Sequence, residues 1–336
     1  MELPEPELLV AARAGDADAF DQLVGPYRRE LAAHCYRMLG SPHDAEDALQ
    51  ESLLSAWRGL PGFEGRSSLR TWLYRISTNA CLRLNSKRPR RVLSPDHGPP
   101  RQDTSDLGNW VTGPVWLEPW PDDLAADEPG PAASYLQREG VELAFVAALQ
   151  HLPGTQRAAL ILREVLEYSA AEVAQLLETT PAAVNSALQR ARKAVDERVP
   201  DVSQQVELAA LGEDGRRELV DAFVRAWERA DVDALVTLLA EDARFTMPPL
   251  PAWFDGRASV ARFFAERVFE SAWRLVPIWV NAQPGFACYQ RYAGADRFRL
   301  GAINVLSLRA GLITEITGFL DPGVHRLVDV PPELPG

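Results

Sequence analysis

Apolar residues recur with helical spacing from Ser41 onward. Ser41 followed by Pro42 is a typical helix start, an N-cap residue and then proline at the first helical position. One face of the predicted helix then carries small or apolar side chains, at Ala45, Ala48, Leu49, Ser52, Leu53, Ala56 and Trp57. The opposite stripe is acidic with one leucine in its middle, and consists of Asp47, Glu51, Leu54 and Arg58. Such a stripe alone is also typical of an ordinary solvated surface.

A second predicted helix follows and has a different outer face. Ser67 or Ser68 caps it, and its buried face holds Leu69, Trp72, Leu73, Ile76, Ala80 and Leu84. The other face mixes basic, polar and aromatic side chains, Arg70, Tyr74, Arg75, Thr78, Asn79 and Arg83, and continues into Lys87, Arg88, Arg90 and Arg91. Cations bind phosphates, and rings or guanidinium planes stack on unpaired bases, so this face is typical of a nucleic-acid surface. We expect Arg75 and Asn79 to face DNA and Trp72 to lie mostly in the core.

Residues 7–39 are predicted to form two helices that break near Gly15 and Asp16. Their apolar positions keep helical spacing and are expected to pack beneath the two helices above. They are Phe20, Leu23, Val24, Tyr27, Leu31, Met38 and Leu39. Gly40 is predicted to end the second of these helices. Residues 1–91 are therefore predicted to form one all-α domain, a helical bundle.

Residues 92–135 are rich in proline and acidic residues, which predicts a linker without regular structure. Three tryptophans, Trp110, Trp116 and Trp120, lie within the run WVTGPVWLEPW. The segment is either a disordered tether or is anchored to a neighbouring domain by these rings. We favour the anchored alternative, because three tryptophans so close together are unusual in a solvated tether.

Residues 136–199 return to helical spacing and end in two short capped helices. Ser169 with Glu172 is a capping box, and Thr180 precedes Pro181 at the start of the next helix. The outer face of that last helix carries Ala182, Asn185, Ser186, Gln189, Arg190 and Lys193. Asn and Gln can read base edges while Arg and Lys hold phosphates, so the pair is predicted to be a helix-turn-helix. A purely structural helical hairpin is the alternative.

Both helical segments resemble a known family. DAEDALQESLLSAWRGL followed by FEGRSSLRTWLYRISTNACLRL, within about residues 7–91, is similar to region 2 of the extracytoplasmic-function (ECF) sigma factors of bacterial RNA polymerase. The later helices, which end in RARKAV, are similar to sigma region 4. The family commonly has a bulkier basic residue where Asn185 or Ser186 stands, so the base contacts made there stay open.

The resemblance implies three sets of contacts. The first helix docks on the clamp coiled coil of core RNA polymerase, which assigns polymerase binding to Asp44, Asp47, Gln50, Glu51 and Leu54. The second helix reads the −10 promoter element as single strand, through Arg70, Tyr74, Arg75, Thr78, Asn79, Arg83, Lys87 and Arg88. The helix-turn-helix reads the −35 element, through Ala182, Asn185, Ser186, Gln189, Arg190 and Lys193. The linker between them follows the RNA exit path, where its acidic residues could imitate nascent RNA.

The last third of the chain changes to mixed structure. Residues 200–213 are expected to be a polar tether, and residues 327–336 a tail. Between them, over 214–326, helices precede β-like runs, with Arg309-Ala310-Gly311 as a hairpin turn, which predicts an α+β cone. This order and the loop around WFDGR resemble the SnoaL-like, nuclear-transport-factor-like domain. In some ECF sigma factors such a domain is fused at the C-terminus and modulates activity.

Domains of this kind enclose an apolar pocket. Candidate lining residues for an unknown small ligand are Trp227, Trp253, Phe254, Asp255 and Phe286, although aromatic core residues would show the same pattern. Relatives that are enzymes use a buried acid or histidine beside a tyrosine or a second acid. The candidates here are Asp242, Asp255, Tyr289, Tyr292, Asp321 and His325, and they form no diagnostic pair, so we predict no catalysis.

Composition supports a nucleic-acid-binding protein that depends on a partner. The 336 residues, 46% of them hydrophobic, suffice for two or three domains. The net charge of −12 disfavours tight DNA binding by the chain alone, yet cations cluster at Arg83–Arg91 and Arg190–Lys193. The three cysteines, Cys35, Cys81 and Cys288, show neither disulfide nor zinc spacing, so no metal or other cofactor is expected. Without a signal peptide or an apolar run of about 18 residues, a cytoplasmic protein is expected.

The sequence therefore predicts a multidomain protein, with two all-α sigma domains followed by an α+β cone-shaped SnoaL-like domain. Its expected function is promoter-specific transcription initiation with core RNA polymerase, modulated by the cone. Two alternatives stay open at this point. One is a cone-fold enzyme with a DNA-binding N-terminal part, and the other is a ligand-sensing regulator that binds DNA without polymerase.

Overall fold

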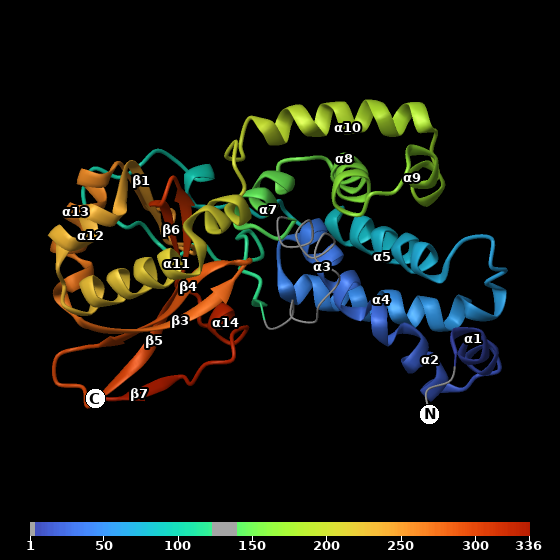
Figure 1. Ribbon diagram of the computed structural model, residues 1–336, viewed down its shortest axis with the longest axis horizontal. Helices are drawn as coiled ribbons and strands as arrows, with labels where there is room; N and C mark the ends of the chain where they lie inside the picture. Colours follow the sequence, from blue (N-terminus) through green and yellow to red (C-terminus); the bar gives the residue numbers. More distant parts are fainter. Residues whose placement is uncertain (1–3, 123–139) are drawn as a thin grey trace. The chain divides into compact units, whose positions relative to one another are not determined.

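The computed structural model describes residues 4–122 and 140–336, and they form two compact units (Figure 1). The first unit comprises Met1–Arg90 and Ala148–Val199, and the second comprises Arg91–Ala147 and Pro200–Gly336. The two predicted helical domains thus share one unit, and most of the predicted linker belongs with the cone. The predicted end of the linker at residue 135 lies outside the described residues.

The N-terminal part of the first unit contains five α-helices. They are α1 (Glu5–Arg13), α2 (Ala17–Val24), α3 (Arg28–Leu39), α4 (Pro42–Gly59) and α5 (Leu69–Asn85). The predicted break at Gly15 and Asp16 is confirmed, because Asp16 accepts a hydrogen bond from the Ala19 amide and caps α2. A further break at Gly25–Tyr27, where a 3₁₀ turn contains proline, separates α2 from α3 and was not predicted.

The predicted caps of the two central helices are confirmed. Ser41 accepts from the Asp44 amide at 3.2 Å, with Pro42 at the first position of α4. Ser68, not Ser67, caps α5 and accepts from the Thr71 amide at 3.1 Å. These short contacts fix where each helix begins and therefore which residues share a face.

A buried polar layer lies between α3 and α5. His34 Nε2 and Thr78 Oγ1 are 2.9 Å apart, and neither residue has exposed surface. The Tyr74 ring meets the His34 ring edge-on, with 5.2 Å between the centroids. Burial, followed by repulsion from Arg37 and Arg70, lowers the pKa of His34 to about 3. The imidazole is therefore neutral in the folded protein at physiological pH.

The second part of the first unit is the predicted helix-turn-helix with its supporting helices. It contains the end of α7 (Leu143–Gln150), then α8 (Gly154–Leu160), a π-helical turn (Ile161–Val165), α9 (Ala170–Leu176) and α10 (Pro181–Asp196). The Ser169–Glu172 capping box is present, and Thr180 accepts from the Ala183 amide at 3.2 Å. The inner stripe of α10 is buried as predicted, at Val184, Leu188, Ala191 and Val195.

The second unit is an α+β domain built on one mixed sheet (Figure 1). Its helices are α11 (Gln204–Glu228), α12 (Val232–Leu238), α13 (Arg257–Glu266) and the short α14 (Pro322–His325). Its strands are β1 (Leu239–Thr246), β2 (Trp253–Asp255), β3 (Ala272–Val280), β4 (Gln283–Arg291), β5 (Arg297–Arg309), β6 (Leu312–Phe319) and β7 (Glu333–Pro335). The strand order is β2-β1-β6-β5-β4-β3, and β7 pairs with β5.

The prediction that residues 200–213 form a polar tether is wrong for most of this range. From Gln204 onward it forms the first turns of α11, capped by Ser203, with a kink at Gly212 where φ is 69°. The apolar side chain of Leu208 is 3% exposed and joins the core of the cone. Burial of that face stabilises a helix that the polar composition did not predict.

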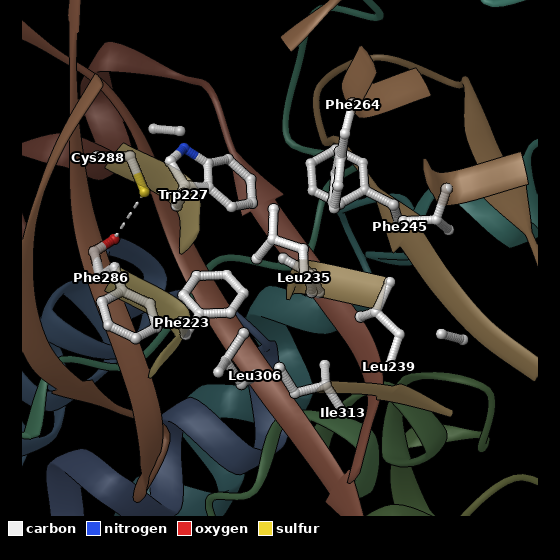
Figure 2. Close-up of a cluster of buried hydrophobic side chains, with 14 of the residues drawn as sticks. Phe223, Trp227, Leu235, Leu239, Phe245, Phe264, Phe286, Cys288, Leu306 and Ile313 are labelled. Carbon is white, nitrogen blue, oxygen red and sulfur yellow. Dashed lines mark hydrogen bonds between the residues drawn. The ribbon is translucent and has the colours of Figure 1, made fainter. Parts of the chain in front are cut away.

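Aromatic rings fill the interior of the cone (Figure 2). Phe223 stacks on Phe286 with 4.8 Å between centroids, and Trp227 meets Phe264 edge-on at 5.1 Å. The Cys288 thiol donates to the Phe286 carbonyl at 3.6 Å. This core holds α11 against the inner face of the sheet.

Over its described residues, 92–122, the proline-rich segment belongs to the second unit and contains a 3₁₀ turn at Ser94–Asp96. Trp116 and Trp120 are buried, and the backbone of Trp120 bonds to Asn281 of the cone, as the anchored alternative predicts for this residue. Trp110 is 50% exposed and does not anchor the segment.

The neutral His34 predicts a pH dependence of stability. The pKa of an unfolded histidine is near 6.5 and that of His34 is about 3, so the unfolded chain binds more protons between these values. The free energy of unfolding should therefore fall by up to about 1.4 kcal/mol per pH unit as the pH drops below 6.5. His34→Gln keeps a polar side chain without this titration, so urea unfolding of the two proteins should diverge as the pH falls. Parallel curves between pH 7 and 4.5 would contradict the prediction.

Candidate functional site

The acidic stripe of α4 is exposed to solvent, as predicted. Asp47, Gln50 and Glu51 are exposed, and Leu54 is 56% exposed between two turns of charged residues. Asp44 is an exception, because its side chain is only 6% exposed and pairs with Arg88. It lies in the first turn of α4 beneath that arginine, and its role in polymerase binding stays a prediction.

The acidic stripe and the basic end of α5 partly neutralise one another. Arg83 contacts Glu51 at 2.7 Å with both side chains about half exposed, and Arg88 reaches Asp47 at 3.9 Å. Exposed pairs of this kind contribute about 0–1 kcal/mol. Both surfaces therefore stay available to partners that offer stronger complementary charge.

The outer face of α5 is partly as predicted. Arg75, Arg83 and Lys87 are exposed and Asn79 is half-buried, while Trp72 is 8% exposed and lies in the core. Arg75 and Arg83 lie two turns apart on this side of α5, with Asn79 between them, and Lys87 follows the end of the helix. The face can therefore contact successive phosphates of a strand laid along α5.

Tyr74 and Thr78 were predicted to lie on that outer face, and the prediction that they are exposed is wrong. Neither has any exposed surface, because one helical turn separates them and both point at α3. His34 on α3 supplies the polar and aromatic contacts that make the site suitable for them. That histidine, within an otherwise apolar pattern, was the sequence signal for a polar partner on the facing helix.

Arg70 is half-buried and engaged. Its Nε donates to both carboxylate oxygens of Glu30 at 3.0 Å, and its Nη2 donates to Glu30 Oε2 at 2.8 Å. Its guanidinium carbon lies 4.8 Å from the centre of the Tyr74 ring. A strand of nucleic acid could contact Arg70 only at the expense of this bidentate pair.

The six predicted side chains on α10 are all exposed. They are Ala182, Asn185, Ser186, Gln189, Arg190 and Lys193. They share the face opposite the buried stripe, so the small residues lie at the N-terminal end of α10 and the cations at its C-terminal end. This is the arrangement in which a recognition helix presents its first turns to base edges.

The five predicted pocket residues do not share a pocket. Trp227, Phe254 and Phe286 belong to the packed core, where Phe254 stacks on Phe263 with 4.2 Å between centroids. Trp253 Nε1 donates to the Gly98 carbonyl at 2.8 Å. Asp255 is exposed and pairs with Arg244 at 3.3 Å. Ring-to-ring packing and a lined cavity produce the same apolar pattern in sequence, and the three core rings show the packed alternative.

The candidate catalytic groups of the cone are engaged elsewhere or exposed. Asp242 pairs with Arg309 at 2.6 Å, and Asp321 accepts from the Gly323 amide at 2.7 Å as the cap of α14. The Tyr289 hydroxyl donates to the Pro331 carbonyl at 2.7 Å, and Tyr292 is 61% exposed. His325 Nε2 lies 3.1 Å from the Phe319 carbonyl oxygen, and burial lowers its pKa.

The described residues contain neither a candidate metal centre nor a candidate membrane span. Over 4–122 and 140–336, no group of three or more His, Cys, Asp or Glu side chains is placed to hold a metal ion. None of the helices in that part of the chain is long and apolar enough to cross a membrane.

A set of buried polar residues that sequence reasoning missed holds the linker to the cone. Asn281, at the β3–β4 turn, accepts through Oδ1 from the Trp120 amide at 2.9 Å and donates through Nδ2 to the Val141 carbonyl at 2.6 Å. Its own amide donates to the Trp120 carbonyl at 2.8 Å. Gln283 accepts from the Leu143 amide at 2.8 Å. We call Asn281 and Gln283, together with the Trp120, Val141 and Leu143 backbone groups that they bind, the linker clasp.

The N-terminus of α11 completes the clasp. Glu142, just before α7, accepts from the Gln204 and Gln205 amides at 3.0 Å each, so its carboxylate caps this helix. Gln204 in turn pairs with both backbone groups of Leu308 on β5, at 3.0 and 2.7 Å. Isolated Asn, Gln and Glu residues carry no sequence pattern for such a network, which explains why it was not predicted.

Comparison with known proteins places both units in families. The chain matches "Sigma-70 region 2" over residues 23–91, "Sigma-70, region 4" over 142–195 and "SnoaL-like domain" over 220–316. The ECF RNA polymerase sigma factor SigG of Mycobacterium tuberculosis is 40% identical over 325 residues, which are 96% of this chain and 86% of SigG. The chain belongs to the ECF RNA polymerase sigma factors.

Other relatives of this sigma factor agree. SigW of Bacillus subtilis is 27% identical over 203 residues, which are 60% of the sigma factor and 100% of SigW. The crystal structure of the ECF sigma factor SigJ of Mycobacterium tuberculosis has the same fold, with a TM-score of 0.62 and 22% identity over 92% of the sigma factor and 100% of SigJ. The sigma factor therefore acts in promoter-specific transcription initiation and carries a fused SnoaL-like domain.

The exposed cations of α5 predict a change in salt dependence. In Arg75→Ala, holoenzyme binding to a single-stranded −10 fragment should weaken, and the slope of log affinity against log salt should fall by about 0.7, as for one lost phosphate contact. Arg217→Ala removes an arginine whose side chain is 68% exposed on α11 of the cone and serves as the control. Equal slopes for the two variants would contradict a local contact at Arg75.

Proposed function

We propose that the sigma factor binds core RNA polymerase through the exposed face of α4. The observation that carries this proposal is Leu54, which is 56% exposed among Asp47, Gln50 and Glu51. A leucine inside an acidic rim offers both an apolar contact and electrostatic steering to a basic partner surface. Charge alone would serve an ordinary solvated helix, and the exposed leucine favours a docking surface.

The two DNA-reading surfaces follow from the placement of the cations. Arg75, Arg83 and Lys87, with Asn79 beside them, form the surface for the single-stranded −10 element. The exposed face of α10, from Ala182 to Lys193, forms the surface for the −35 element. The net charge of −12 opposes DNA binding by the free chain, so polymerase must supply part of the affinity. A protein that binds polymerase and promoter DNA in this way acts in the cytoplasm, where both are found.

Reconstitution with core polymerase tests this function. The wild-type chain should direct promoter-dependent transcripts, and Leu54→Arg should reduce them at least about ten-fold, because one buried apolar anchor is worth 2 kcal/mol or more. Leu312→Arg is the matched control, since Leu312 is also partly exposed, at 38%, but lies on the cone. Equal transcription by the two variants would contradict docking through α4, and activity without polymerase would favour a regulator that acts alone.

The cone restrains the sigma factor by holding its linker. The linker clasp bonds Trp120 and Val141 to Asn281, which is fully buried. Earlier in the linker, Ser94 donates to the Leu250 carbonyl at 2.9 Å, and the Arg101 amide donates to the Trp253 carbonyl at 2.8 Å. A linker fixed at these points cannot also extend through a path in polymerase. This contact needs no small ligand, since the aromatic interior of the cone is already packed.

Release of the clasp tests the restraint. Asn281 has φ of 56°, a conformation that glycine adopts easily, so Asn281→Gly removes the side-chain hydrogen bonds without backbone strain. We expect faster proteolysis of the segment 91–122 and more transcription at limiting polymerase. Ala310→Gly, at the β5–β6 turn with φ of 52°, is the matched control. Faster proteolysis with unchanged or lower transcription would contradict the restraint.

A further inference from the structure

Arginines gather at the end of the cone where β4 turns into β5. Four of them lie on the strands that meet at this end, and they are Arg274, Arg291, Arg297 and Arg299. The turn itself, over 292–296, and the strands β3, β4, β5 and β7 contain two carboxylates, Asp296 and Glu333. In a chain with a net charge of −12, these elements are therefore locally cationic.

Two of the arginines share one aromatic ring. Phe298 on β5 is 4% exposed, and the guanidinium carbons of Arg274 and Arg291 lie 4.8 and 4.7 Å from the centre of its ring. Arg274 also donates through Nη1 to the Pro335 carbonyl of β7 at 2.9 Å. A cation–π contact holds a guanidinium in place without using its N–H donors. The ring therefore orders both side chains and leaves their donors to an anion.

The other two arginines share one carboxylate. Arg297 and Arg299 alternate with Phe298 along β5, so they lie on the opposite face of that strand. Glu333 on β7 pairs with Arg297 at 2.8 Å and with Arg299 at 3.1 Å, and the Arg299 side chain is 77% exposed. One carboxylate cannot neutralise two guanidinium groups, so positive charge remains on this face as well.

This pattern differs from that of several other exposed arginines on the cone, each of which has a carboxylate of its own. Those pairs are Arg217 with Glu213, Arg244 with Asp255, and Arg309 with Asp242. Among the residues that the structure describes, no carboxylate oxygen lies within 4.0 Å of a guanidinium nitrogen of Arg274 or Arg291. Ordered cations without a compensating charge are suited to an anionic partner.

An exposed ring lies next to these cations. Tyr292 follows Arg291 directly, begins the β4–β5 turn and is 61% exposed. Its carbonyl accepts from the Ala295 amide at 3.0 Å, so the turn is fixed through the backbone and does not need the ring. Guanidinium groups bind phosphates and exposed rings stack on unpaired bases, so cations around such a ring are typical of a surface for single-stranded nucleic acid. An acidic protein partner would require the charge but not the ring.

We propose that the β4–β5 end of the cone is a binding surface for single-stranded nucleic acid, in which Tyr292 stacks on a base and Arg291 and Arg299 hold the phosphates beside it. A sigma factor acts where separated promoter strands and new RNA are both present, and either of them offers this chemistry. All residues of the surface lie in the second unit, and the proposal does not rest on the roles of α4, α5 and α10. It gives the SnoaL-like domain a contact with nucleic acid in addition to its hold on the linker.

Photo-cross-linking of the full chain locates the surface. Dodecamers of thymidine and of uridine that carry 4-thio bases should form adducts within residues 291–299. Adducts with either dodecamer support the shared chemistry, and the higher yield identifies DNA or RNA as the preferred strand. Adducts confined to residues 4–90 and 148–199 would overturn the proposal. Displacement by polyglutamate of equal charge, as efficient as by unlabelled dodecamer, would also overturn it, since polyglutamate offers charge without bases.

Variants of Tyr292 test the stacking. Tyr292→Ala should weaken binding of a labelled dodecamer to the full chain about five-fold, which is at the lower end of the effect of stacking on one base. Tyr292→Phe keeps the ring and should bind like the wild-type protein. Trp279→Ala is the matched control, since Trp279 is 45% exposed on β3 but lies opposite Pro284, near the β3–β4 turn. Equal affinities of Tyr292→Ala and Trp279→Ala would contradict stacking on Tyr292.

Salt dependence tests the cations. Arg299→Gln should lower the slope of log affinity against log salt by about 0.7, as for one lost phosphate contact on a single strand. Arg217→Gln, at a position that is 68% exposed on α11, should leave the slope unchanged. Equal slopes for these two variants would refute a phosphate contact at Arg299. None of these measurements requires polymerase, so their outcome is separate from that of the proposed role in initiation.

Discussion

Buried backbone groups outside helices and strands must find hydrogen-bond partners, and both units satisfy this constraint with long polar side chains. In the first unit, Arg157 and Gln150 bond to carbonyl groups at the end of α3 and in the turn before α8. In the second, Asn281 and Gln283 bond to the linker backbone on both sides. Each cluster joins segments that are far apart in sequence, so the arrangement of each unit depends on a few polar residues as well as on its apolar core.

The nature of these contacts suits reversible interfaces. An intramolecular hydrogen bond contributes only about 1 kcal/mol net, because water replaces it when the contact opens. An apolar interface of equal size would resist opening more strongly, since separation exposes its whole surface to water. Polar contacts therefore hold region 4 and the linker in defined places without making those places permanent.

The helical parts were predictable because their signals are local. Ser41, Ser68, Ser169 and Thr180 each bond to an amide three residues later, so a short window of sequence contains the whole interaction. The exposed face of α10 follows from its buried stripe by the same helical geometry. For such elements, spacing along the chain and position in space carry the same information.

The errors arose where a residue's environment comes from a distant segment. Tyr74 is buried because α3 places His34 opposite it, and Asp44 is buried because Arg88 folds back over the start of α4. Neither partner is close in sequence. Leu208 belongs to a helix only because the cone covers it, and the aromatic residues of the cone pack together where a pocket was expected. In each case the local sequence pattern fitted two environments equally well, and contacts with a distant segment determined which one the residue adopts.

The two charged surfaces of region 2 also explain how an acidic protein can bind DNA when polymerase is present. Arg83 and Arg88 lie against Glu51 and Asp47, so the free chain screens its own cations. These pairs are exposed and weak, and a partner that binds the α4 carboxylates withdraws them from the arginines. The cations of α5 then face a strand without nearby opposing charge. Under the proposed docking through α4, polymerase binding and promoter binding reinforce one another through these weak ion pairs, without a change of fold in region 2.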